Sequence, residues 1–151
     1  MAGTYSNLLY HLVFSTRNRM PYINDIDFEK RLHEYLGGSI RGNNGVPYAI
    51  NGTADHIHIL FRWIPNGNLS NLMRDVKSQS SKWVHETFTS HKDFAWQEGF
   101  GAFSVSFSQM GRVKNYLAGQ KNHHEKINFQ DEFRTFLKRH RIEWDENTIW
   151  L

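Results

Sequence analysis

The sequence predicts one α+β domain of the ferredoxin-like kind, a split β-α-β antiparallel sheet with helices on one face, followed by C-terminal helices. The length of 151 residues suits a single core. Apolar periodicity switches between strand and helix spacing in the order β-α-β-β-α-β. The 39% hydrophobic content, with 22 aromatic side chains among it, excludes a disordered chain. Because no linker or repeat interrupts the pattern, we expect residues 1–151 to form one domain.

The expected elements follow from this periodicity. Residues 5–16 are apolar on both alternating faces, which is typical of a central strand. Gly37 and Gly38 should loosen the first helix, and Gly42 to Gly45 should end it. The other elements are helices at 24–40, 69–88, 109–122 and 129–141, and strands at 46–51, 55–63 and 100–107.

Two absences limit the function. There is no Cys, which excludes a disulfide framework, a thiolate metal site and a Cys nucleophile, so any metal must be held by His, carboxylate or amide groups. No apolar run is long enough for a membrane span, and Met1 to Thr4 lack the features of a signal peptide. We therefore expect a cytoplasmic protein without a membrane partner.

Positive charge is concentrated near the C-terminus. The net charge is +3, but residues 112–141 alone hold eight Lys or Arg against three acids. A local basic surface is typical of proteins that bind nucleic acid, and it is also typical of a solvated helical face. Charge alone leaves both interpretations open.

The first chemical motif is His56-Ile57-His58 inside an apolar strand. Side chains alternate along a strand, so the two imidazoles share one face while Ile57 points to the other. Two imidazoles placed in this way can bind one divalent cation. A hydrogen-bonded pair of surface histidines would give the same pattern.

The second motif is Tyr116 followed by Gln120 on a predicted helix. Residues at i and i+4 share a helix face. A Tyr hydroxyl can attack phosphorus, and a Gln carbonyl oxygen can bind a hard cation. An ordinary amphipathic helix with a half-buried Tyr is the alternative.

Taken together, the motifs resemble those of the HUH (His-hydrophobic-His) single-Tyr endonucleases, and most closely the IS200/IS605 family of single-strand transposases. The resemblance covers nearly the whole chain. It is carried by the segments Tyr10–Phe14, Asp55–Leu60, Lys77–Ser81, Trp96–Ser106, Val113–Gln120 and His123-His124. One departure is Phe100, where many relatives carry Tyr after the preceding Gly.

The resemblance implies a metal-dependent transposase that cleaves and rejoins single-stranded DNA through a 5′-phosphotyrosine at Tyr116. It implies Mg²⁺ or Mn²⁺ held by His56, His58 and Gln120. The expected substrate is DNA with hairpin ends, in a bacterial or archaeal cell. The expected assembly is a homodimer with a merged sheet, in which the Tyr helix of one chain can complete the site of the other.

Further residues are assigned supporting roles. Asp55 is expected to accept a hydrogen bond from an imidazole that binds the metal and so to orient it, or else to form a turn. His123 and His124 continue the face of Tyr116 and Gln120, where they could assist the metal or hold phosphate. The expected DNA contacts are Arg74, Lys77, Ser81, Arg112, Lys114 and Lys121.

Three alternative functions stay open at this point. The chain could be a domesticated relative that cuts repeated (REP) hairpins without mobilising its own gene. It could be a non-catalytic nucleic-acid-binding module, because β-α-β-β-α-β is also the order of RRM domains. It could be a small metal-dependent hydrolase that uses His56 and His58 but not Tyr116.

Overall fold

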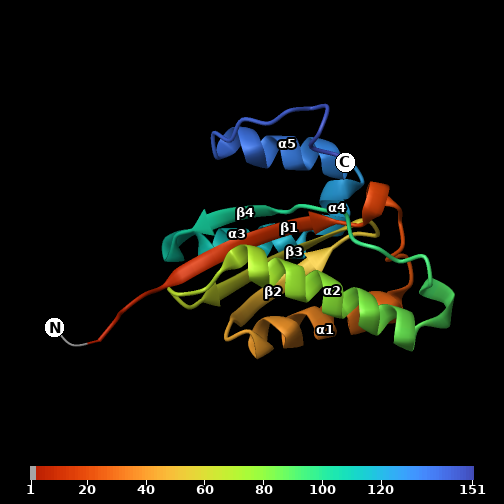
Figure 1. The fold of residues 1–151 in the computed structure, drawn as a ribbon. Helices are drawn as coiled ribbons and strands as arrows, with labels where there is room; N and C mark the ends of the chain where they lie inside the picture. The colour runs from red at the N-terminus through yellow and green to blue at the C-terminus, as the bar shows by residue number, and fades with distance from the viewer. Residues whose placement is uncertain (1–2) are drawn as a thin grey trace.

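A four-stranded antiparallel sheet forms the centre of the computed structural model, which describes residues 3–151 (Figure 1). Strand β1 (Leu8–Ser15) pairs with β3 (His56–Trp63) on one side and with β4 (Gly101–Val105) on the other. Strand β2 (Val46–Gly52) forms the edge beyond β3, which gives the order β2-β3-β1-β4. The predicted ferredoxin-like class and the central place of the first strand are both confirmed.

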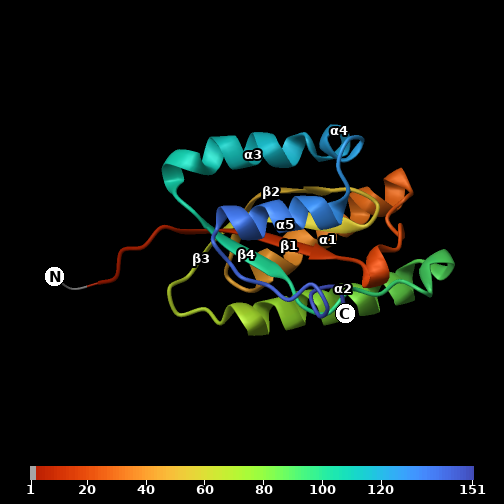
Figure 2. The ribbon, with the colours of Figure 1, turned by 90° about the horizontal axis from the view of Figure 1, so that it is seen from above.

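Helices cover both faces of this sheet, α1 and α2 on one face and α3, α4 and α5 on the other (Figure 1). The view from above shows α5 lying over the middle of the sheet and α3 beside β2 (Figure 2). The helices are α1 (Ile26–Gly42), α2 (Leu69–Thr87), α3 (Met110–Ala118), α4 (Gln120–His124) and α5 (Phe129–Arg139). Single 3-10 turns occupy Arg17–Arg19, Thr89–His91 and Phe107–Gln109.

The larger core lies between the sheet and the α1–α2 layer. Ile57, Ile59 and Phe61 point into it from β3, as strand alternation requires. Apolar residues at helical spacing meet them from the two helices. These are Phe28, Leu32, Leu36 and Ile40 of α1 and Leu72, Met73, Val76 and Val84 of α2.

A smaller cluster lies on the opposite face, where α5 covers β1 and β4. Val13 and Phe103 contribute from the sheet, and Phe129, Phe136 and Leu137 contribute from α5. The side chains of His56 and His58 belong to this second face, because Ile57 between them faces the larger core. The C-terminal helices therefore cover the strand that carries the histidine pair.

Each helix in the first layer begins at a side-chain cap. Asp25 accepts a hydrogen bond from the backbone N–H of Phe28, and Asn68 accepts one from Asn71. Such caps satisfy N–H groups that have no partner inside the helix. Asn128 caps α5 in the same way, by accepting from Asp131.

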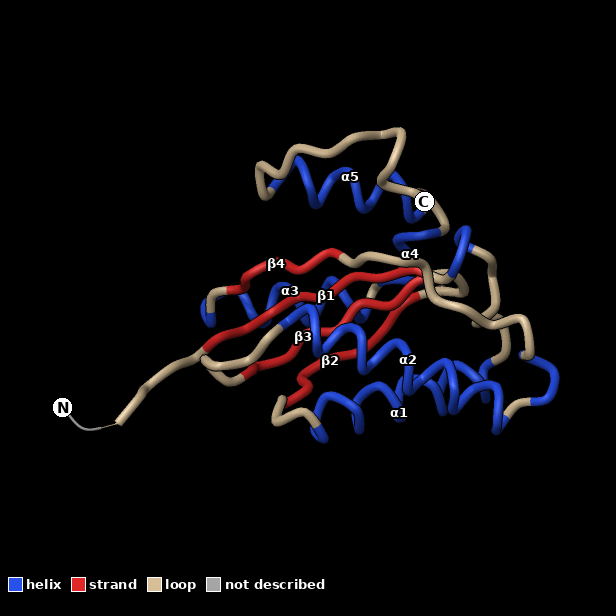
Figure 3. Tube along the Cα trace, viewed as in Figure 1, coloured by secondary structure: helices blue, strands red, loops and turns tan. Residues whose placement is uncertain are grey.

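Two boundaries differ from those expected from the sequence. Helix α1 continues through Gly37 and Gly38 to Gly42, because its buried apolar face outweighs the low helix propensity of glycine. The helix expected at 109–122 is broken at Gly119, whose φ of −92° and ψ of 12° end α3 before α4 begins. Figure 3 shows the irregular stretches that follow α2 and α5.

None of the helices in residues 3–151 has the length and apolar character that crossing a bilayer requires.

The packing of α1 leads to a prediction about stability. Phe28 is fully buried and packs edge-on against Phe88 and Phe94. Phe28→Ala should lower the free energy of unfolding by about 3–5 kcal/mol, measured by urea denaturation. Ile26→Ala is the matched control on the same helix, because Ile26 is 88% exposed. The control should change stability by no more than about 0.5 kcal/mol, and an equal loss in both variants would contradict the packing described.

Candidate active site

The histidine pair on β3 is completely buried. His56 and His58 each have 0% relative exposure, so the alternative of a surface pair does not hold. Antiparallel pairing places His58 opposite Val13 and His56 opposite Ser15, near the end of β1. Both imidazoles face the layer formed by α3, α4 and α5.

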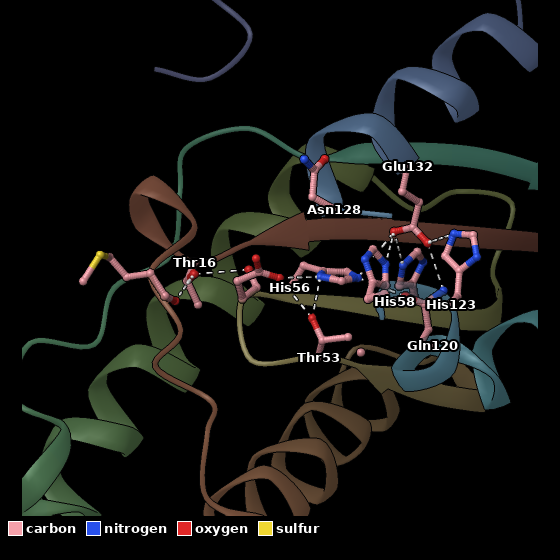
Figure 4. Close-up of polar contacts among 12 residues, drawn as sticks. Thr16, Thr53, His56, His58, Gln120, His123, Asn128 and Glu132 are labelled. Atoms are coloured by element: carbon pink, nitrogen blue, oxygen red, sulfur yellow. Dashed lines mark hydrogen bonds and ion pairs between the residues drawn. The ribbon is translucent and has the colours of Figure 1, made fainter. Parts of the chain in front are cut away.

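A buried carboxylate from α5 lies at the centre of the site. Glu132 has 2% exposure, and its Oε1 lies 3.0 Å from His58 Nε2 and 3.4 Å from His56 Nε2. His124 Nε2 approaches the same oxygen to 3.0 Å. In Figure 4, Glu132 reaches from its helix toward the imidazoles of the strand. Burial tends to raise the pKa of Glu132, but its contacts with His124, His56 and His58 outweigh this and hold the pKa far below its usual value.

His56 is held from its other side by an acid. Its Nδ1 lies 2.7 Å from Asp55 Oδ1 and 3.0 Å from the Thr53 hydroxyl. Burial would lower the pKa of His56, but hydrogen bonds to Asp55 and Glu132 raise it to about 9. The acid thus fixes the orientation of the ring and leaves Nε2 directed into the site.

His58 is held by a third histidine, from the neighbouring strand. His11 Nε2 lies 2.8 Å from His58 Nδ1, and both rings are buried. Burial lowers the pKa of His58 to about 4 and, together with His58, lowers that of His11 to about 3. Both rings are therefore neutral near pH 7, so His58 is in the state that a metal ligand needs. His56, with its raised pKa, must release a proton when a cation binds.

Tyr116 reaches the same carboxylate from α3. Its hydroxyl donates a hydrogen bond to Glu132 Oε2, and its ring lies edge-on to His58 at a centroid distance of 5.9 Å. Helix α3 is fixed to β2 by the fully buried Leu117, whose carbonyl accepts a hydrogen bond from the Asn51 amide. Burial and the nearby Glu132 carboxylate raise the pKa of the Tyr116 hydroxyl, so it is protonated at neutral pH.

Gln120 is fully buried at the break between α3 and α4. Its Oε1 lies 3.0 Å from His56 Nε2, while its Nε2 donates to Glu132 Oε2 at 3.0 Å. An uninterrupted helix would keep Tyr116 and Gln120 on one face. The break at Gly119 still brings both side chains to the carboxylate.

The structure separates the two neighbouring histidines of α4. The His124 side chain is 9% exposed and close to Glu132. The His123 side chain is 36% exposed, and its Nε2 lies 3.6 Å from Glu132 Oε2. His124 Nε2 is buried without a hydrogen bond of acceptable geometry, although it faces the carboxylate.

These side chains fit a divalent cation. His56, His58, His124 and Glu132 each offer an atom within 4.8 Å of the others. Imidazole nitrogen and carboxylate oxygen are common ligands of divalent metals. His124 Nε2 lies 3.0 Å from Glu132 Oε1 but makes no hydrogen bond of acceptable geometry, so it remains available as a ligand atom. The Gln120 oxygen lies at the edge of the same group.

Two pockets lie beside the site. An open pocket of about 510 Å³ is lined by Asp55, His124 and Phe129, among others. A smaller pocket of about 70 Å³ is lined by Tyr116, Glu132 and Arg139, among others.

The residues expected to contact DNA fall into two groups. Arg74, Lys77 and Ser81 lie on α2, across the sheet from the site. The ammonium of Lys77 is engaged, since it donates to the carbonyls of Gln97 and Gly99. The other group, Arg112, Lys114 and Lys121, is exposed on α3 and α4, where Lys121 pairs with Glu29 at 2.8 Å. DNA contact by either group stays a prediction.

Sequence reasoning missed Glu132 and the role of His11. A signal for Glu132 was present, because it occupies the buried stripe of α5 formed by Phe129, Phe136 and Leu137. A carboxylate at that spacing must have partners inside the protein. His11 lies in the first strand, within the segment Tyr10–Phe14, but only the pairing of that strand with β3 shows that it contacts His58.

Comparison with known proteins gives one family. The model of the family described as "Transposase IS200 like" matches residues 4–120. A search of curated proteins finds no match.

Two solved structures share the fold. A candidate transposase from Deinococcus radiodurans R1 has a TM-score of 0.63 and 19% identity, over 80% of this chain and 95% of that one. A REP-associated tyrosine transposase bound to a REP hairpin has a TM-score of 0.60 and 15% identity, over 84% of this chain and 74% of that one.

The buried imidazoles lead to a prediction about metal binding. The double substitution His56→Ala with His58→Ala should abolish measurable Mn²⁺ binding in calorimetric titration, because it removes two of the nitrogen ligands. It should also lower stability by about 3–5 kcal/mol, since Glu132 loses partners for its buried charge. The control is His33→Ala on α1, which should leave the affinity unchanged. Wild-type Mn²⁺ affinity in a folded double variant would rule out this site.

Proposed function

Because this chain belongs to the IS200-like transposase family, we propose that it cleaves and rejoins single-stranded DNA through a covalent bond to Tyr116. One observation carries the proposal: the Tyr116 hydroxyl meets the Glu132 carboxylate that also faces the buried histidine pair. A nucleophile beside a candidate cation site is the arrangement that phosphodiester transfer needs.

Tyr116 supplies the attacking oxygen. As its Oη forms a bond to phosphorus, the hydroxyl proton leaves, the bond from phosphorus to the 3′ oxygen breaks, and that oxygen takes up a proton. The products are a 5′-phosphotyrosine and a free 3′-OH. Since the new bond is again a phosphodiester, a 3′-OH of another strand can reverse the step without ATP. Strand transfer, rather than simple hydrolysis, follows.

His56, His58 and Gln120 are the proposed holders of Mg²⁺ or Mn²⁺. A bound cation would supply Lewis-acid stabilisation of the charge on the phosphate. The chain prepares these groups in advance, since Asp55 orients His56 and His11 orients His58. Their burial keeps water from competing for the same contacts.

Hairpin DNA is the proposed substrate. The solved relative that is named as bound to a REP hairpin shares this fold, which supports the same class of ligand here. Arg112 and Lys114 are exposed on the helix that carries Tyr116, so they can contact phosphates close to the proposed point of cleavage. This similarity also makes a domesticated nuclease for REP hairpins the second candidate, with the same chemistry.

The other two alternatives are less well supported. RRM domains bind RNA on an exposed sheet face through stacked aromatic residues. Here the corresponding face carries buried histidines under α5. A hydrolase without a role for Tyr116 leaves its contact with Glu132 unexplained.

Tyr116 lies against the histidines of its own chain, which supports a site completed within one chain. The homodimer with a merged sheet stays a prediction.

The role of Tyr116 can be tested by removing only its hydroxyl. Tyr116→Phe should abolish covalent attachment of a labelled hairpin oligonucleotide, seen as a shifted band under denaturing conditions. Hairpin affinity should stay within about 2-fold, because the ring still packs against Phe136. Tyr35→Phe is the control, because it removes a hydroxyl on α1. That variant should cleave the oligonucleotide at the wild-type rate. Covalent attachment by Tyr116→Phe at the wild-type rate would refute the assignment.

A further inference from the structure

The two oxygens of Glu132 face different partners. Oε1 lies among the Nε2 atoms of His56, His58 and His124, at 3.4, 3.0 and 3.0 Å. Oε2 accepts hydrogen bonds from the hydroxyl of Tyr116 and from the amide of Gln120. We propose that Glu132 is a bridging carboxylate, which binds the divalent metal through Oε1 and positions the Tyr116 hydroxyl through Oε2. The inference rests on the proposed function and adds Glu132 and His124 to the metal ligands.

Both added residues lie outside the segment that identifies the family. The family match ends at residue 120, whereas His124 lies at the end of α4 and Glu132 lies on α5. The strand, α3 and the start of α4 thus supply His56, His58, Tyr116 and Gln120. The segment after residue 120 brings a third imidazole and the carboxylate to them, as Figure 4 shows for Glu132.

The surroundings of Glu132 favour a ligand over a purely structural ion pair. The negative charge of a buried carboxylate must be balanced by nearby partners, and one pair of histidines would be enough for that. Here three imidazoles converge on one oxygen, and the third, His124, makes no hydrogen bond of acceptable geometry. A cation bound beside Oε1 would give that nitrogen a partner and would neutralise the carboxylate.

The bridge explains how the nucleophile is placed. The Tyr116 ring is fixed on its edges by Phe136 and His58, and its hydroxyl is fixed by Glu132. When one carboxylate contacts both the metal and the attacking group, the distance between them is set before substrate binds. Holding reacting groups in this way lowers the entropic part of the barrier.

The donor set also favours one kind of cation. Three imidazoles suit transition metals, whereas Mg²⁺ prefers oxygen ligands and water. We therefore expect the site to bind Mn²⁺ more tightly than Mg²⁺.

The competing role for Glu132 predicts the opposite result. Its Oε1 lies between the imidazoles, so the carboxylate could exclude a cation instead of binding it. Removing the charge would then strengthen metal binding, whereas removing a ligand weakens it.

Calorimetric titration of the whole protein with Mn²⁺ and with Mg²⁺ separates these roles. Glu132→Gln and His124→Ala should each weaken Mn²⁺ binding by at least about 10-fold. Glu125→Gln is the matched control, because it makes the same change at an exposed position of the same segment, and its affinity should equal that of the wild type. Unchanged or tighter Mn²⁺ binding by Glu132→Gln would overturn the proposal.

A second measurement tests the bridge to Tyr116. At saturating Mn²⁺, His124→Ala should recover the wild-type rate of covalent attachment to a hairpin oligonucleotide, because only metal affinity was lost. Glu132→Gln should stay at least about 10-fold slower, since an amide binds a cation and the hydroxyl more weakly. Equal recovery by both variants would refute the positioning role of Glu132.

The two readouts keep this inference separate from the proposed function. If the wild-type protein binds Mn²⁺ but forms no covalent DNA product, the proposed function fails and the ligand set stands. If the wild type forms the product and Glu132→Gln binds Mn²⁺ equally well, the ligand set fails. Circular dichroism checks that each variant folds. If Glu132→Gln does not fold, Glu132→Asp is used in its place. Weakened Mn²⁺ binding by that variant is expected, and wild-type binding would contradict the proposal.

Discussion

The contact between the Glu132 carboxylate and the imidazoles of β3 is the interaction on which the site depends. A buried charge is tolerated only when partners surround it, and a carboxylate that is 2% exposed among His56, His58 and His124 meets that requirement. The same contact joins α5 to the sheet, with Phe129 stacked on His56 beside it. Thus the chemistry of the site and the docking of the C-terminal helix are stabilised by the same groups.

The sheet makes this arrangement possible by separating two tasks. One face of β3 carries Ile57 and Ile59 into a large apolar core, which stabilises the strand. The other face carries His56 and His58, whose buried polar rings also need hydrogen-bond partners. A neighbouring group then fixes each ring. Asp55, from the adjoining turn, holds His56, and His11, which the pairing of β1 with β3 brings close, holds His58. Each ring is therefore held in a fixed orientation before any ligand binds.

Much of the fold and part of the site could be predicted from the sequence. Strand alternation placed His56 and His58 on one face, and helical spacing placed Tyr116 near Gln120, because both are local properties of the backbone. The continuation of α1 to Gly42 depends on tertiary packing, which periodicity does not report. The break at Gly119 falls at a residue of low helix propensity within an otherwise continuous apolar pattern. Helical spacing could have shown that Glu132 is buried, but not which groups it meets, since its partners are 8 to 76 residues away in sequence.

We propose that Tyr116 forms the covalent bond to DNA beside the candidate metal site. Mass spectrometry of the trypsin-digested covalent product tests it most directly, after nuclease trimming of the bound oligonucleotide. Cleavage after Lys114 and Lys121 releases Asn115–Lys121, a peptide with Tyr116 as its sole tyrosine. If Tyr116 is the nucleophile, this peptide carries the added 5′-phosphonucleotide. An adduct on any other peptide, or cleaved DNA without an adduct, would contradict it.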